Sequence, residues 1–283
     1  MIKTLAALAA LGLASSAVAQ PREIRAEGPE GDLVGTLLPT APDIPVVLII
    51  PGSGPTDRDG NNPLGVSAAS YRLLAEALAP RGIGSIRIDK RGLFGSLAAV
   101  PNPNDVTIGA YAHDVHAWIA AARAEADADC LWLLGHSEGG LVALAAAQQS
   151  EGVCGVLLVA SVGRKAGAIL REQLQANPAN APILPDALAA IDALEAGERV
   201  SVEGMHPARQ VLFIPAVQGF LIDMMAQDPA ALAGTLNVPA LIVAGGSDLL
   251  SPPTDGEALA EAQPDAELVV VEYMNHVLKR VEA

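Results

Sequence analysis

Short apolar runs alternate with helix-forming stretches along most of this chain, and this alternation constrains the fold more than any other feature. The runs are rich in Val, Ile and Leu: VVLIIPG, SIRIDKRG, LWLLGHS, GVLLVAS, PALIVAGGSD and ELVVVEYMNH. Strands of this composition are typical of a parallel sheet that helices cover on both faces. We therefore predict an α/β fold with a mostly parallel central sheet, preceded by a hairpin formed from REIRAEG and LVGTLLPT.

The interval from about 163 to 236 breaks this alternation, because it contains helical pieces and prolines but no convincing strand. Apolar runs resume after it, so the chain is expected to return to the same sheet. We interpret the interval as a helical insertion that forms a lid over the carboxyl edge of the sheet, with a separate domain as the alternative. We therefore predict one domain over residues 20–283, with the lid inside it.

The first nineteen residues have the pattern of a secretory signal peptide. MIKTLAALAALGLASSAVA carries one early charge at Lys3, an apolar run of Ala and Leu, and the cleavage pattern Ala17-Val18-Ala19. A membrane anchor is the alternative, but the run is short for a span. We predict that residues 1–19 are removed and that the protein is exported, to the periplasm or outside the cell, with no integral membrane span afterwards.

The charge balance argues against a nucleic-acid partner. The formal net charge is −15, and loss of Lys3 with the signal takes it to −16. A chain this acidic repels nucleic acid and anionic membrane surfaces. Composition leaves the substrate and the oligomeric state open.

Two cysteines stand at the start of two apolar runs that we expect to be neighbouring parallel strands. Such strands lie about 5 Å apart, which is within disulfide reach of Cys130 and Cys154. Export would permit the bond. The sequence allows either a disulfide or two buried free thiols.

The segment GHSEG, residues 135–139, fits G-x-S-x-G and stands between an apolar run and a helix-forming stretch. A sharp strand-to-helix turn of this kind strains the serine backbone and holds the hydroxyl above the sheet, at the positive end of the helix. Glycines two positions away on either side leave room for the turn. In these residues the chain resembles the α/β-hydrolase superfamily, which implies that Ser137 is a nucleophile.

A serine hydroxyl needs a base, and the base needs an acid that orients it. His276 follows the last apolar run and Asp248 follows ALIVAGG, so the order Ser137, Asp248, His276 matches that of the resembled superfamily. Asp255 is expected inside the next helix as an N-terminal charge. His136 is expected to pack beside the turn.

Attack by the serine creates an oxyanion that needs N–H donors. One expected donor is the backbone N–H of Glu138, which follows the nucleophile. The other is the backbone N–H of Ser53, in the glycine-rich loop PGSGPTDRDGNN after VVLII. Related hydrolases often have His-Gly where this chain has Pro51-Gly52, and a backbone donor survives that change.

Mixed charges follow two of the predicted strands, and we expect ion pairs among them to fix the oxyanion loop, with binding of an anionic substrate as the less favoured alternative. They are Asp57, Arg58, Asp59, Asp89, Lys90 and Arg91. The loop 57–68 imitates a calcium loop but lacks the required glycine and glutamate at its sixth and twelfth positions. His113 and His116 lie three apart without a further clustered ligand. We predict no metal and no cofactor.

Three further segments, GSGPTDRDGN, IDKRG and NHVLK, carry a resemblance to a bacterial group of exported esterase-like α/β-hydrolases, often grouped with serine aminopeptidase-like or lysophospholipase-like relatives. The resemblance implies hydrolysis of a small-molecule carboxylic ester. It also implies a helix after the His276 loop, whereas only seven residues follow His276. We therefore allow for a missing C-terminal helix, which would leave apolar sheet exposed and the His276 loop weakly anchored.

The interval 163–236 is expected to determine substrate specificity. Five apolar residues are candidates for an acyl pocket, although they could equally pack the lid onto the body: Phe220, Leu221, Met224, Met225 and Leu249. Peptide or other amide hydrolysis is the nearest alternative function, and it would need a lid carboxylate such as Glu195, Glu198 or Glu203. A non-catalytic ligand-binding relative is a second alternative.

Overall fold

The computed structural model describes residues 20–39 and 44–282. The predicted signal peptide, residues 1–19, lies outside the described residues. Among the described residues no helix has the length and apolar character needed to span a bilayer.

Within the described ranges, eight strands form one sheet in the spatial order β1-β2-β6-β3-β7-β8-β9-β10, and a two-stranded hairpin, β4–β5, lies apart from it. The strands are β1 Arg22–Ala26, β2 Leu33–Leu38, β3 Val46–Ile50, β4 Asn61–Asn62, β5 Val66–Ser67, β6 Gly84–Ile88, β7 Leu131–His136, β8 Val153–Val159, β9 Ala240–Gly245 and β10 Glu267–Val271. Strands β1 and β2 pair antiparallel, as does β2 with β6, and every other pair in the sheet is parallel. The predicted N-terminal hairpin and mostly parallel sheet are both confirmed.

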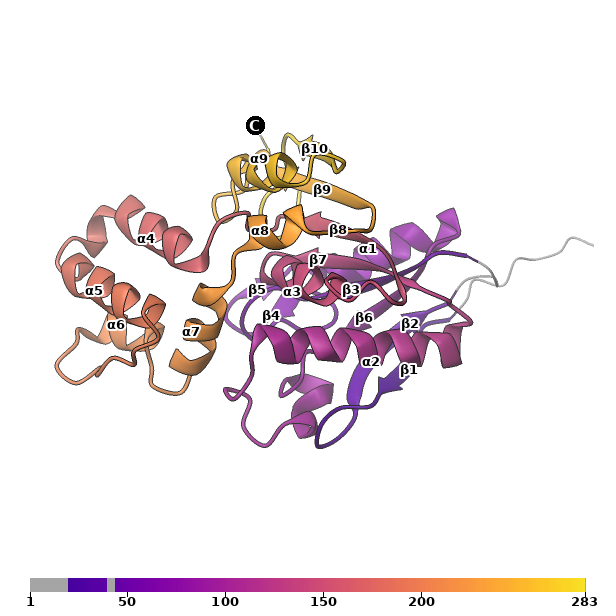
Figure 1. Ribbon diagram of the computed structural model, residues 1–283, viewed down its shortest axis with the longest axis horizontal. Helices are drawn as coiled ribbons and strands as arrows, with labels where there is room; N and C mark the ends of the chain where they lie inside the picture. Colours follow the sequence, from indigo (N-terminus) through magenta and orange to yellow (C-terminus); the bar gives the residue numbers. More distant parts are fainter. Residues whose placement is uncertain (1–19, 40–43, 283) are drawn as a thin grey trace, which may run out of the picture.

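Helices cover both faces of this sheet, as predicted (Figure 1). The α-helices are α1 Ser70–Leu78, α2 Ile108–Ala126, α3 Glu138–Ala147, α4 Ala166–Ala176, α5 Leu184–Glu195, α6 Pro207–Leu212, α7 Gln218–Ala226, α8 Pro229–Gly234 and α9 Pro253–Ala262. Three short 3-10 turns accompany them: η1 Ala79–Arg81, η2 Phe94–Ala99 and η3 Pro178–Asn180.

Alternate residues of the strands enter two separate cores. Leu48 and Ile50 of β3 pack on the face that carries α2 and α3, where Trp118 is fully buried. Val47 and Ile49 of the same strand point to the opposite face. Successive side chains of a strand point to opposite faces, so a central strand of a doubly covered sheet is apolar throughout. This requirement explains the continuous VVLII run.

The segment between β8 and β9 contains only helices and turns among its described residues, and β9 nevertheless pairs directly with β8. Helices α4 to α7 stand to the left of the sheet in Figure 1 and have a small core of their own, which includes Leu194 and Phe213. The sheet is therefore continuous across this segment, and Ala233 and Leu236 at its end join the main core. The segment is therefore an insertion between two neighbouring strands.

No helix follows β10 among residues 272–282, which form turns and one isolated bridge. The three valines at the end of β10 are between 39% and 48% exposed. Among the described residues, turns therefore follow β10 where the resemblance implied a helix.

Candidate active site

Ser137 occupies a strained turn between β7 and α3. Its φ of 55° and ψ of −122° lie outside the regions that a non-glycine residue normally adopts. A Cβ at Gly135 would clash with the Gly139 carbonyl, and a Cβ at Gly139 would clash with the Ile50 carbonyl. The two glycines are therefore required by close backbone approach on both sides of the serine.

Three side chains from distant parts of the sequence meet at the carboxyl edge of the sheet. His276 Nε2 lies 3.1 Å from Ser137 Oγ, and His276 Nδ1 lies 2.9 Å from Asp248 Oδ2 and 3.1 Å from Oδ1. Since a carboxylate only accepts, Nδ1 carries the proton, which leaves Nε2 free to accept from the serine hydroxyl. This is the arrangement that activates a serine nucleophile.

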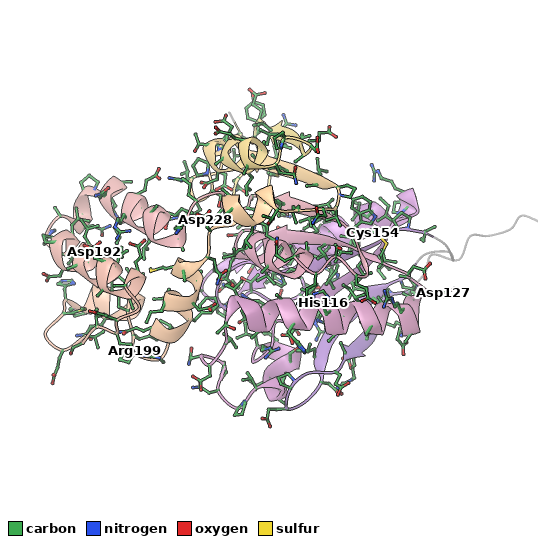
Figure 2. All side chains as sticks on the ribbon, in the orientation of Figure 1. His116, Asp127, Cys154, Asp192, Arg199 and Asp228 are labelled. Atoms are coloured by element: carbon green, nitrogen blue, oxygen red, sulfur yellow. A yellow bond between two sulfur atoms is a disulfide. The ribbon has the colours of Figure 1, made fainter. Side chains whose placement is uncertain are left out.

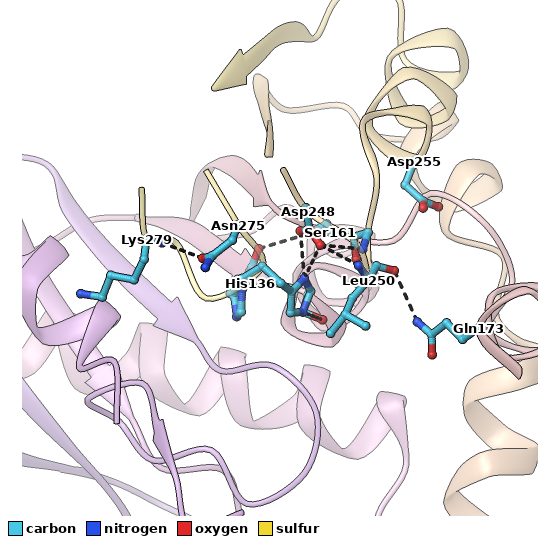
Figure 3. A network of polar contacts seen from close by, with 12 residues as sticks. His136, Ser161, Gln173, Asp248, Leu250, Asp255, Asn275 and Lys279 are labelled. Atoms are coloured by element: carbon cyan, nitrogen blue, oxygen red, sulfur yellow. Dashed lines mark hydrogen bonds and ion pairs between the residues drawn. The ribbon is translucent and has the colours of Figure 1, made fainter. Parts of the chain in front are cut away.

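Asp248 is held as a carboxylate by several donors. Its side chain is completely buried, and Oδ1 accepts the N–H groups of Leu250 at 2.8 Å and Ser251 at 2.9 Å. Burial acts to raise the pKa of Asp248, but the hydrogen bonds from His276 and from these N–H groups outweigh it and place the pKa below its usual value. Figure 3 shows this network, with Gln173 of α4 bonded to the Leu250 carbonyl.

The loop that carries His276 is anchored from three sides, so the expectation of a weakly held loop is wrong. Asn275 and Lys279 close it with two hydrogen bonds of 2.9 Å, one backbone–backbone and one to the Asn275 side chain. Ser70 Oγ of α1 donates to the Val277 carbonyl at 2.5 Å. The NHVLK segment is thus a self-closed turn docked on α1, which does not require a following helix.

The loop after β3 lies directly against the nucleophile. A Cβ on Gly52 would lie 3.2 Å from the Ser137 Cβ, which shows how close the two backbones are. The Gly52 N–H already donates to Tyr71 Oη at 3.2 Å. Both Ser53 and Glu138 line the cavity above Ser137. The Gly52 N–H is thus engaged, and the Ser53 and Glu138 N–H groups stay the predicted oxyanion donors.

His136 packs beside the turn and joins the two loops around the serine. Its Nε2 lies 2.7 Å from the His276 carbonyl, and its Nδ1 lies 2.7 Å from Tyr71 Oη. The carbonyl must accept, so Nε2 carries the proton and Tyr71 donates to Nδ1. Burial lowers the pKa of His136 to about 4, assisted by the neighbouring His276, so the imidazole is neutral at pH 7.

The charged residues after β3 and β6 form ion pairs, as predicted. Arg58 contacts Asp89 at 3.0 Å, and the Arg58 N–H donates to the same carboxylate at 2.9 Å. Arg87 pairs with Asp59. These contacts fix the loop that leads from Ser53 to α1.

A third ion pair joins Lys90 to Glu138, with Lys90 also contacting the Gly52 carbonyl, and a fourth joins Arg91 to Asp114 of α2. Burial raises the pKa of Asp114 against the opposing effect of Arg91. Among the described residues no group of three His, Cys, Asp or Glu side chains is arranged to hold a metal ion.

Asp255 makes different contacts from Asp248. It is fully buried near the start of α9 and accepts the Gly163 N–H at 3.0 Å and the Arg164 guanidinium at 2.9 and 3.0 Å. Arg164 also pairs with Glu172 of α4. Asp255 therefore anchors the point where the chain leaves β8 for the helical segment.

A cavity of about 480 Å³ opens above Ser137. The helical segment contributes apolar side chains to it, and the main ones are Ile169, Leu170, Leu212, Leu221, Met224 and Met225. The expectation of an acyl pocket is wrong for two residues. Phe220 packs on Tyr111 with ring centres 6.1 Å apart, and Leu249 is 90% exposed, whereas its neighbour Leu250 lines the cavity.

The carboxylates considered for a peptidase do not reach this cavity. Within the described part of the chain its lining includes none of Glu195, Glu198 and Glu203. Glu195 pairs with Arg171 on α4 instead. None of these three carboxylates is therefore placed to hold a substrate amino group in the cavity.

Cys130 and Cys154 are joined as a disulfide, with Cα atoms 5.3 Å apart. Cys130 directly precedes β7 and Cys154 is near the start of β8, so the bond is at the amino ends of these strands, opposite the serine. Cys154 lies far from helices α4 to α7 (Figure 2).

The sequence did not predict the roles of Tyr71 and Ser70 or the contact of Lys90 with Glu138. Each acts through a contact with a residue at least 19 positions away in the sequence. The sequence signal for Ser70 and Tyr71 was the polar start of SYRLLAEAL, which is also typical of an ordinary helix start.

Comparison with known proteins identifies the family. A model of the alpha/beta hydrolase family matches residues 46–278, which is most of the chain. This chain belongs to the alpha/beta hydrolase family, and the resemblance inferred from the elbow motif is confirmed.

Esterase EstD of Thermotoga maritima is 24% identical over 241 residues, covering 83% of this chain and 54% of that protein. The chain thus spans about half the length of this curated relative. Among solved structures, the alpha/beta hydrolase GrgF from Penicillium sp. sh18 superposes with a TM-score of 0.63 at 21% identity, covering 91% of both chains. A thermophilic esterase from Thermogutta terrifontis gives a TM-score of 0.58 at 23% identity, covering 92% of both. These structures share the fold.

Proposed function

We propose that this protein is a serine hydrolase that cleaves carboxylic esters through an acyl-enzyme. The observation that carries the proposal is the hydrogen-bonded series from Ser137 through His276 to Asp248, with the serine on a strained elbow. Esterase EstD and the Thermogutta esterase support the choice of ester as substrate class.

In the proposed mechanism, Ser137 Oγ attacks the ester carbonyl while His276 Nε2 takes its proton. The Ser53 and Glu138 N–H groups stabilise the oxyanion, and His276 then protonates the leaving alcohol. Water, deprotonated by the same imidazole, releases the acid from Ser137. Asp248 keeps the imidazole in the required tautomer and stabilises its charged form.

The test uses a fluorophosphonate probe and short p-nitrophenyl esters with native protein and Ser137→Ala. We expect labelling and turnover in the native protein, and neither in the variant, because an alanine has no nucleophile to acylate. Arg25→Ala, at an exposed position of β1, serves as the control variant and should keep both labelling and turnover. An active Ser137→Ala protein would refute the proposal.

We further propose that residues 163–236 act as a lid that selects an apolar acyl group. The apolar cavity residues of α4 and α7 support this role. The contacts that hold the segment on the body include Arg164 with Asp255, and the Asp223 carboxylate with the Ile108 N–H at 2.7 Å. Rates across p-nitrophenyl esters of increasing acyl length test it, and a flat profile would contradict it.

Export is proposed on two independent grounds. Residues 1–19 have the signal-peptide pattern, and the Cys130–Cys154 disulfide suits an oxidising compartment. Mass spectrometry of protein recovered from the periplasm or medium should find Gln20 as the first residue. Recovery of the intact chain from the cytoplasm alone would contradict export.

A further inference from the structure

A buried ion pair connects the two expected oxyanion donors. Lys90 follows β6, and its Nζ donates to the Gly52 carbonyl oxygen at 2.7 Å and to Glu138 Oε1 at 2.9 Å. The Lys90 and Glu138 side chains are each 4% exposed. Nζ also lies 5.2 Å from the centre of the Tyr111 ring. One ammonium group therefore bridges the loop after β3 and the first residue of α3.

The contact with Gly52 acts on the neighbouring donor through a single peptide group. The Gly52 carbonyl and the Ser53 N–H belong to the same planar trans peptide, so they point in opposite directions. A donor fixed on the carbonyl side therefore orients the N–H on the other side. It also polarises the amide, which strengthens the hydrogen bond that the Ser53 N–H can donate.

The contact with Glu138 orients the second donor. The Glu138 carboxylate supplies the counter-charge that lets an ammonium remain buried, and the same residue begins α3 and lines the cavity above Ser137. The two donors belong to segments far apart in the sequence. Pairing of β3 with β7 brings the two segments together, and Lys90 adds a direct link between them.

We propose that Lys90 is a positioning residue for the oxyanion hole, acting with Glu138 to hold the Ser53 and Glu138 N–H groups at the separation that the transition state requires. The inference rests on the proposed ester hydrolysis. Lys90 transfers no proton, because its bonded partners are Gly52 and Glu138 rather than Ser137 or His276.

The principal test replaces both charges at once, in the variant Lys90→Met/Glu138→Gln. No unpaired charge is left in the interior, yet the Gly52 carbonyl loses its donor. We expect kcat to fall roughly thirtyfold with KM within about threefold of native, because a lost oxyanion donor costs about a hundredfold or more and a displaced one costs part of that. Affinity for a trifluoromethyl ketone, whose adduct on Ser137 carries an oxyanion, should fall with kcat/KM.

The matched control is Arg91→Leu/Asp114→Asn. That pair is also buried, with contacts of 2.5 and 2.6 Å, but it joins the loop after β6 to α2 and does not touch Gly52 or Glu138. We expect it to lose stability and to keep its kcat and inhibitor affinity. A native-like kcat in the Lys90 variant, or an equal loss of kcat in the control, would overturn the proposal.

Glu138→Gln alone keeps the test decisive if the double variant does not fold. Its amide oxygen can still accept from Lys90, so folding is expected, but Lys90 is held less firmly without its counter-charge. We expect kcat to fall by about three- to tenfold at unchanged KM, as a partly displaced donor requires, and an unchanged kcat would overturn the proposal. Fluorophosphonate labelling of native Ser137 is scored separately, so failure of the proposed function is distinguishable from failure of this inference.

Discussion

Mild acid should destabilise this protein through one buried imidazole. His136 is neutral in the folded protein, with its pKa lowered from 6.5 to about 4 by burial and by His276. Its Nε2 N–H donates to the His276 carbonyl, and its Nδ1 accepts from Tyr71. Protonation would give Nδ1 a hydrogen that opposes the Tyr71 hydroxyl, and it would place a charge in the interior.

The sign follows from the order of the two pKa values. The unfolded chain binds a proton near pH 6.5, whereas the folded protein binds it only near pH 4. The contribution of His136 to stability is therefore complete above pH 6.5 and is lost as the pH falls toward 4. Between pH 7 and pH 4.5 the loss should be about 2 kcal/mol, since one pKa unit corresponds to about 1.4 kcal/mol.

The assay is urea denaturation of native protein and His136→Gln at several values of pH. Gln does not titrate, so the difference in free energy of unfolding between the two proteins should shrink by about 2 kcal/mol between pH 7 and pH 4.5. Asp248, whose pKa is below its usual value, loses its contribution only at more acidic pH and is present in both proteins. A difference that does not change with pH would refute the reasoning.

Three further outcomes are expected. Asp248→Asn should lower kcat about 10⁴-fold with the fold intact, because the amide favours the wrong tautomer of the imidazole. Turnover of p-nitrophenyl acetate measures this, and a loss below tenfold would contradict the assigned role. Cys130→Ser/Cys154→Ser should lower the free energy of unfolding by about 3 kcal/mol and leave kcat unchanged, because the bond closes a loop remote from the serine; urea denaturation measures it. Leu221→Trp should fill part of the cavity and lower kcat/KM for a decanoate ester about tenfold more than for an acetate ester. Equal losses for the two esters would show that Leu221 does not limit acyl length.

The elements and the catalytic order were predictable because their signals are local. GHSEG needs glycines at fixed distances from Ser137, whatever the rest of the chain does. Asp248 and His276 were found because parallel strands bring their carboxyl ends to one edge, so a polar residue just after a strand is a candidate for the same site.

The lining of the cavity was only partly predictable. Phe220 and Leu221 are adjacent in α7, yet one packs on Tyr111 and the other faces the cavity. The faces of a short helix that is apolar all round are not distinguished by hydrophobicity. Leu249 and Leu250 form a similar pair, because Asp248 accepts the Leu250 N–H and this turn exposes Leu249.

By itself the sequence determined the parallel sheet, the strained serine and the residues that end the strands, since each depends on neighbours within a few positions. Only the tertiary structure decided how the site is held: Lys90 between Gly52 and Glu138, and His136 between Tyr71 and the His276 carbonyl. A buried polar group must find a partner, but many arrangements of the chain could satisfy that need. Which partner it meets is settled when the sheet brings the loops together.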